Sequence, residues 1–229
     1  TEGKFLEGRN GLTGTVVEQP SREATIAELY NDDGYVVVFA APVRDSHGKL
    51  IGVWANFADF GLVEEIAEST YRSLAVAGMP GTEITVVDPS GNIIIDLDPI
   101  RSKGAAYKRD WNIIGKFNLI EQGVGVAKRA IDGESGWAVA SHARKKIDQV
   151  AGFSHSVGAY DYPGLGWSVL VRVPTAEAYA TVSRQITVMQ WAIMAFALLI
   201  LAGGVVAGTL AARPLKRMTS AMTAIAGGN

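Results

Sequence analysis

The sequence predicts an α+β protein with antiparallel sheets in two modules, followed by one membrane-spanning helix and a short amphipathic helix. Three observations support this fold class. Residues 34–57 and 82–98 each hold two β-rich runs around a turn, which is typical of a β-hairpin. The residues between Arg184 and Arg213 include no charged side chain. The final residues, 213–229, repeat apolar side chains at helical spacing.

The first hairpin is expected within residues 34–57. Its two strands flank the turn "RDSHGK", in which Asp45, Ser46 and Gly48 are favourable turn residues. Upstream, the segment "TGTVVEQ" can supply a third strand. These residues therefore predict a small antiparallel sheet near the start of the chain.

A connecting helix and a second group of strands follow. The segment "FGLVEEIAESTYRSLAV" has helical periodicity and joins the two groups. The second group holds the hairpin "TEITVVDPSGNIIIDLD", a helical stretch over residues 111–132, and strands in "GWAVASHAR", "QVAGFSHSVGAY" and "GWSVLVRV". The first group shows only the last three strands of this scheme, so we expect an internal repeat whose beginning is cut off.

The uncharged segment is long enough to cross a bilayer, which takes about 20 apolar residues. Trp191 near its start favours the headgroup region. Three basic residues follow the segment closely, namely Arg213, Lys216 and Arg217, whereas only Arg184 lies close before it. By the positive-inside rule, residues 213–229 are expected in the cytoplasm and residues 1–184 outside.

The last residues predict a helix that needs partners. After Pro214, the side chains Leu215, Met218, Met222 and Ile225 recur at intervals of three, four and three, which forms an a/d seam. A helix this short is marginal in water by itself. We therefore expect this segment to pack against other helices, including a second copy of the chain.

Composition limits the remaining classes of function. The chain has 229 residues, of which 48% are hydrophobic, and a net charge of −2, so no nucleic-acid partner is expected. It has no cysteine, which excludes disulfides and thiol catalysis. Because it begins at Thr1 without a signal peptide, we expect it to be a fragment of a longer protein.

The order of elements resembles the double Cache sensor domains, which have membrane-distal and membrane-proximal modules of PAS-like topology. The residues that carry the resemblance are "FAAPVRDSHGKLIGVWANF", "ITVVDPSGNIIID" and "GLGWSVLVRVPTAEAYA". Pro214, the apolar seam and the closing "IAGGN" resemble the first helix of a HAMP domain. Together these segments cover nearly all of the chain and look like a bacterial chemoreceptor, a methyl-accepting chemotaxis protein.

The resemblance implies a division of the chain into six parts. They are the end of a membrane-distal Cache module (1–60), a connecting helix (61–80), a membrane-proximal PAS-like Cache module (81–175), a helical stalk (176–187), a transmembrane helix (188–212) and the start of a HAMP domain (213–229).

The resemblance also implies a function. It is that of a homodimeric receptor in the bacterial inner membrane, which binds a small periplasmic or extracellular molecule and signals through HAMP to cytoplasmic chemotaxis proteins. Sensor histidine kinases and diguanylate cyclases use the same parts, so an enzyme domain after Asn229 is an alternative. A membrane-tethered binding protein without signalling output is a second one, although a simple anchor needs no a/d seam.

In the Cache family the ligand usually lies on the concave sheet of the distal module. Alternation places Trp54 and Asn56 on one face of their strand, and Tyr35 and Phe39 on one face of the preceding strand. We predict a ligand site at these residues and Tyr30, with a hydrophobic core face as the alternative. Asn56 stands where the family's amino-acid motif has an aspartate, and an amide cannot pair with an ammonium group as a carboxylate does. An organic acid or an amino-acid-like molecule is therefore expected, with less support for a standard α-amino acid.

The proximal module offers polar side chains as well. Tyr107, Arg109 and Trp111 lie on the helical loop of this module, and an arginine there could bind a carboxylate bidentately; solvated surface charge is the simpler interpretation. His142 and His155 could meet on neighbouring strands, but no carboxylate completes a metal site. No catalytic residue, metal or cofactor is expected, and the chain is not predicted to be an enzyme.

Overall fold

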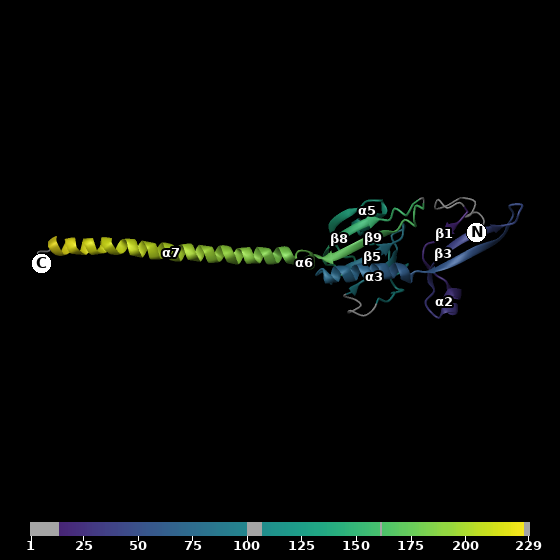
Figure 1. Ribbon diagram of the computed structural model, residues 1–229, viewed down its shortest axis with the longest axis horizontal. Helices are drawn as coiled ribbons and strands as arrows, with labels where there is room; N and C mark the ends of the chain where they lie inside the picture. Colours follow the sequence, from purple (N-terminus) through teal and green to yellow (C-terminus); the bar gives the residue numbers. More distant parts are fainter. Residues whose placement is uncertain (1–13, 100–106, 161, 227–229) are drawn as a thin grey trace. The chain divides into compact units, whose positions relative to one another are not determined.

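Two antiparallel sheets and one long helix make up the chain in a computed structural model that describes residues 14–99, 107–160 and 162–226 (Figure 1). The chain divides into two units, Thr1–Ala178 and Tyr179–Asn229. The first unit contains both sheets, and the second contains most of the long helix. Each unit is described by itself below.

The distal sheet is built around one long hairpin. Its elements are β1 (Val16–Val17), β2 (Ser21–Arg22), α2 (Ala24–Tyr30), β3 (Tyr35–Arg44) and β4 (Leu50–Asp59). β3 pairs antiparallel with β1, β2 and β4. The carboxylate of Asp45 closes the hairpin turn by accepting hydrogen bonds from the backbone N–H groups of His47 and Lys49. The predicted hairpin and third strand are confirmed.

Helix α3 (Gly61–Val76) follows this sheet directly. Phe60, at its N-terminus, is fully buried, and its ring packs edge-on against Tyr35 and Trp167. Burial of large apolar side chains of this kind contributes about 1.5–3 kcal/mol each. The core around Phe60 contains residues of both sheets, so the distal sheet and the proximal sheet share one hydrophobic cluster.

The proximal sheet has five strands in the order β6-β5-β9-β8-β7. Its elements are β5 (Glu83–Val87), β6 (Ile93–Leu97), α5 (Gly125–Ile131), β7 (Gly136–Ser141), β8 (Asp148–His155), β9 (Ser168–Pro174) and the short helix α6 (Thr175–Ala178). Figure 1 shows α3 and α5 on opposite faces of this sheet. The predicted hairpin and the three later strands are confirmed, with β8 and β9 paired antiparallel.

The helical stretch predicted over residues 111–132 is mostly irregular, and only Gly125–Ile131 is α-helix. Two glycines with positive φ, Gly115 at 71° and Gly123 at 72°, interrupt it, because this backbone conformation is incompatible with a right-handed helix. Between them, the side chain of Asn118 accepts hydrogen bonds from the backbone N–H groups of Ile120 and Glu121. The apolar periodicity of this stretch therefore reflects packing of turns against the sheet.

Helix α7 (Ala180–Ala226) is continuous and runs through Pro214. The sequence predicted a boundary there between a transmembrane helix and a second helix. Proline removes one backbone hydrogen bond, but its fixed φ is compatible with a helix, so the helix can continue at a cost. By length and composition, α7 is the one helix of the described chain suited to cross a membrane, with a candidate span of Val182–Ser220.

Candidate functional site

The exposed end of the β3–β4 hairpin carries three of the five residues predicted to bind a ligand. The strand register places Phe39 directly opposite Asn56, and Ala41 opposite Trp54. The Trp54 indole N–H donates a hydrogen bond to the side-chain oxygen of Asn56 at 3.2 Å. Trp54 is 65% exposed and Phe39 is 40% exposed. We call Phe39, Trp54 and Asn56 the distal face.

The other two predicted residues lie elsewhere. Tyr35 is buried, and its hydroxyl donates a hydrogen bond to the carbonyl oxygen of Ile94 at 3.3 Å. Burial raises the pKa of the Tyr35 phenol. Tyr30 lies at the end of α2 and is mostly exposed. The structure therefore brings together Phe39, Trp54 and Asn56, while Tyr35 belongs to the core between the sheets.

The predicted apolar seam lies on α7. Met218 and Met222 are exposed and one helical turn apart, so they lie on one side of the helix. The backbone at Leu215 and Ile225 is helical, but their side chains lie outside the described part of the structure. Residues 227–229, the end of the HAMP-like motif, also lie outside it.

Arg109 joins the distal sheet to the proximal module. Its Nε donates to Glu64 Oε1 at 2.8 Å and its Nη2 donates to Glu64 Oε2 at 2.7 Å, so the pair on α3 is bidentate. Nη1 donates to Asp33, which precedes β3, and Nη2 lies 3.8 Å from Asp59 Oδ1 at the end of β4. We call these four residues the Arg109 cluster.

The Arg109 cluster shows what the predicted bidentate arginine binds in this structure. Its carboxylate partner is Glu64 of the same chain. The sequence had suggested either a ligand carboxylate or solvated surface charge for Arg109, and neither interpretation anticipated this pair. Burial raises the pKa of Glu64, although the hydrogen bond and charge of Arg109 oppose the rise. The cluster therefore depends on Arg109 to keep a buried carboxylate ionised.

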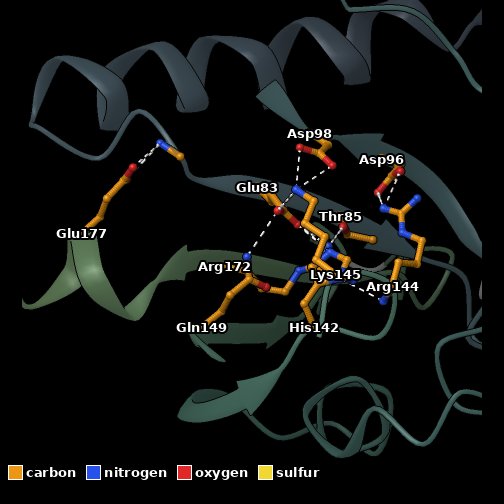
Figure 2. Close-up of polar contacts among 11 residues, drawn as sticks. Glu83, Thr85, Asp96, Asp98, His142, Arg144, Lys145, Gln149, Arg172 and Glu177 are labelled. Carbon is orange, nitrogen blue, oxygen red and sulfur yellow. Dashed lines mark hydrogen bonds and ion pairs between the residues drawn. The ribbon is translucent and has the colours of Figure 1, made fainter. Parts of the chain in front are cut away.

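A second group of polar and charged side chains is buried or half-buried on the face of the proximal sheet that also carries the apolar contacts of α5. Figure 2 shows the contacts among them. Glu83 is its centre. Its carboxylate accepts from Lys145, lies 2.9 Å from Nε2 of His142, and lies 3.4 Å from Nη2 of Arg172. We call the whole group the proximal cluster, and its members are Glu83, Thr85, Asp96, Asp98, His142, Arg144, Lys145, Gln149 and Arg172.

The charges of the proximal cluster are mutually compensated. Burial alone would raise the pKa of Glu83, but the hydrogen bonds from His142 and Lys145 and the charge of Arg172 lower it to about 2. Nδ1 of His142 accepts from the backbone N–H groups of Arg144 and Lys145, so we place the ring proton on Nε2, toward Glu83. Burial also lowers the pKa of the Arg172 guanidinium. The cationic and hydrogen-bonding neighbours of Glu83 therefore favour its ionised form in spite of its burial.

The proximal cluster lies beside the exit of the chain from the sheet. Glu177 on α6 accepts hydrogen bonds from the backbone N–H of Gly81 at 2.9 and 3.1 Å, two residues before Glu83. A side-chain Cβ at Gly81 would lie only 2.5 Å from Glu177 Oε1, so a larger residue there would force the Glu177 carboxylate to shift. This contact therefore holds α6 against the chain just before β5, within the first unit.

Replacing Glu177 with alanine is expected to lower the free energy of unfolding of the first unit by about 1.5 kcal/mol, because a hydrogen bond to a charged group is lost. The amide of Gly81 should then exchange with deuterium faster, which NMR or mass spectrometry can measure. Glu134→Ala, which removes an exposed pair with Arg129, is the control and should leave exchange at Gly81 unchanged. Unchanged exchange in Glu177→Ala would show that this contact does not hold α6.

Sequence reasoning missed most of these charged residues. Glu83, Asp96 and Arg172 lie within strands, and alternation places Glu83 on the same face as the buried Val87. Opposite charges on a buried strand face are the signal that could have found them. His142 and His155, which the sequence allowed to meet, lie at opposite ends of the β7–β8 pair, because Ser141 pairs with Asp148 and Gly136 with Phe153.

Comparison with solved structures gives the fold. The chain is similar to the periplasmic sensory domain of the Campylobacter jejuni chemoreceptor Tlp1, with 17% identity and a TM-score of 0.51 over 77% of this chain and 56% of that one. It also matches the extracellular domain of the putative histidine kinase mmHK1S-Z2, with 14% identity and a TM-score of 0.45 over 75% and 54% of the two chains. The ligand-binding domain of the Pseudomonas aeruginosa chemoreceptor PctB, in complex with L-Arg, matches with 20% identity and a TM-score of 0.46 over 80% and 58%.

The chain thus spans little more than half the length of these structures. No family model matches the sequence, and no curated protein matches it either. The likeness to Tlp1, at this identity, establishes a shared fold. The predicted fold class is confirmed: the first unit has the mixed helix and antiparallel-sheet fold of Cache and PAS-like sensor domains, and α7 is a possible transmembrane span.

Proposed function

We propose that this chain is the sensor and membrane-spanning part of a receptor that binds a small molecule outside the cell and signals across the inner membrane. The observation that carries the proposal is the direct connection of a sensor-domain fold, through β9 and α6, to an apolar helix long enough to span a bilayer. The described apolar side chains of α7 are exposed within its unit, and a lipid bilayer would cover them.

The distal face is the proposed ligand site. Phe39 and Trp54 offer apolar contact, and Asn56 offers one oriented amide, which is the composition of a small-molecule site. An organic acid or an amino-acid-like molecule is the proposed ligand class. This role is one of binding, and we assign no catalytic step to the chain.

A panel of organic acids and amino acids, titrated into the full chain in lipid nanodiscs, tests the distal face. A ligand that binds there should lose about 30-fold in affinity in Trp54→Ala, because truncation of an aromatic anchor costs about 2 kcal/mol. Trp137→Ala is the matched control, since Trp137 is an equally exposed tryptophan on β7. An equal loss of affinity in both variants, or no loss of affinity in Trp54→Ala, would show that the ligand does not bind at the distal face.

The signalling route is the second half of the proposal. A ligand that favours one arrangement of the sheets would shift α6, and the shift would pass along α7 to a HAMP-like bundle of two chains. Gly204 and Gly208 on α7 allow close approach of two such helices.

A chemotaxis output is proposed, and reading the coding sequence on both sides of residues 1–229 tests it. A long heptad-patterned hairpin downstream supports it, whereas a kinase or cyclase domain makes the chain the sensor of an enzyme.

The orientation in the membrane can be measured because the chain has no natural cysteine. In intact cells, a thiol reagent that does not cross the inner membrane is expected to label Ser46→Cys in the hairpin turn. It should label Ser220→Cys only after the inner membrane is permeabilised, because the basic residues around Arg217 favour the cytoplasm. Both native serines are exposed, so access within the protein is matched. The reverse pattern would contradict the proposed orientation.

A further inference from the structure

A cavity of about 350 Å³ lies where the distal sheet meets the proximal module. We call it the junction cavity. Its walls come from both sides, with Arg22 and Tyr35 from the distal sheet and Asp88, Trp111 and Lys116 from the proximal module. Gln19, which also lines the cavity, donates to the carbonyl oxygen of Leu165 at 2.8 Å and accepts from the Trp167 indole at 2.7 Å. Direct hydrogen bonds therefore hold the two sides of the cavity together.

The cations of the junction cavity are not neutralised by its carboxylate. The Arg22 guanidinium lies 4.6 Å from the centre of the Trp111 ring, and its Nε donates to the carbonyl oxygen of Asp33. Lys116 is exposed, and within the described residues its ammonium has no anionic partner. Asp88, by contrast, already accepts hydrogen bonds from the backbone N–H groups of Ser90 and Asn92 and from the Asn92 side chain.

The apolar wall of the cavity is aromatic. The rings of Tyr35 and Trp111 pack edge-on, with centroids 5.2 Å apart, and Ile94 and Ile114 also line the space. Two cations and an aromatic wall that line one cavity suit a molecule with a negative group and an apolar body. A purely inorganic anion would leave the aromatic wall unused, and a cationic ligand would meet like charge.

We propose that the junction cavity is a second ligand site, which takes a small organic carboxylate. Arg22 and Lys116 hold the carboxylate, and the aromatic wall contacts the rest of the molecule. This site is separate from the distal face and goes beyond the proposed function. Because its residues come from both modules, a bound carboxylate favours the arrangement of the sheets in which both sets of contacts form.

Calorimetric titration of the full chain in lipid nanodiscs tests this site with three probes. Benzoate has one carboxylate and a ring, succinate has two carboxylates and no ring, and benzamide is the neutral counterpart of benzoate. Benzoate is expected to bind more tightly than succinate, and benzamide should not bind. Arg22→Ala and Lys116→Gln should each weaken benzoate at least tenfold, because each removes a charge-assisted contact.

Three single variants and one double variant separate the possible outcomes. Lys116→Gln changes an exposed side chain, so the variant should fold as the parent does, and Lys49→Gln is the matched control in the hairpin turn. Trp54→Ala should leave benzoate binding unchanged, which separates this site from the distal face. The proposal is overturned if neither carboxylate binds, if binding survives in the Arg22→Ala, Lys116→Gln double variant, or if Trp54→Ala abolishes it. The last result would place carboxylates at the distal face and support the proposed function instead.

Discussion

Replacing Glu83 with glutamine is expected to lower the free energy of unfolding of the first unit by about 3–5 kcal/mol. The Glu83 side chain is 1% exposed and contacts His142, Lys145 and Arg172. Removing its charge leaves the Arg172 guanidinium, which is 5% exposed, without its nearest anion in the described part of the sheet. A buried charge that loses its partner is far more costly than an exposed one, since water cannot reach it.

Urea unfolding of the full chain in detergent, followed by tryptophan fluorescence, measures this loss. Asp132→Asn is the control, because Lys128 and Asp132 form an exposed pair on and just after α5 whose loss costs at most about 0.5 kcal/mol. A loss for Glu83→Gln as small as that of the control would show that the proximal cluster is not held by its ion pairs.

Acid titration gives a second readout for the same variant. The pKa of Glu83 is about 2 in the folded chain against 4.5 for a free side chain, so its ionised form stabilises the fold. This contribution is complete above pH 4.5 and is lost as the pH falls toward 2. Glu83→Gln should therefore lose less stability than the parent chain across this range.

The elements that the sequence predicted well are those with local signals. Both hairpins close through an aspartate whose carboxylate accepts backbone N–H groups within the same turn, at Asp45 and at Asp88. The long uncharged segment likewise appears as one helix. In each case the residues that determine the structure are close in sequence, so turn chemistry and periodicity are sufficient to predict it.

The polar clusters could not be predicted in the same way. Arg109 is separated from Glu64 by 45 residues, and Lys145 is separated from Glu83 by 62. The first pair depends on how a loop packs against α3, and the second depends on the order of strands in the sheet, in which β9 lies between β5 and β8. Periodicity indicated which strand faces are buried, but not which charges would meet on them. The distal face was predictable because its alternation is local, although its role as a ligand site stays a prediction.

Arg109→Leu is expected to cost about 3 kcal/mol of stability near pH 7, and the cost should shrink as the pH is lowered. The variant leaves Glu64, whose side chain is 8% exposed, without its bidentate partner. Its pKa is already raised by burial, and without Arg109 it should rise further. A carboxylate whose folded pKa lies above its unfolded value stabilises the fold at low pH and loses this contribution as the pH rises. Urea unfolding at pH 5 and pH 7 measures the difference.

Arg72→Leu is the matched control for Arg109→Leu, because Arg72 pairs with Glu68 on the exposed side of the same helix, α3. It should change stability by less than about 0.5 kcal/mol at either pH. A cost for Arg109→Leu that does not depend on pH would mean that Glu64 reaches water once its partner is gone. In that case the two modules separate at this point in the variant, and the ion pairs of Arg109 are what hold them together in the parent chain. If the cost instead becomes smaller as the pH is lowered, the modules stay closed around a neutral Glu64. The shared core around Phe60 then holds them together.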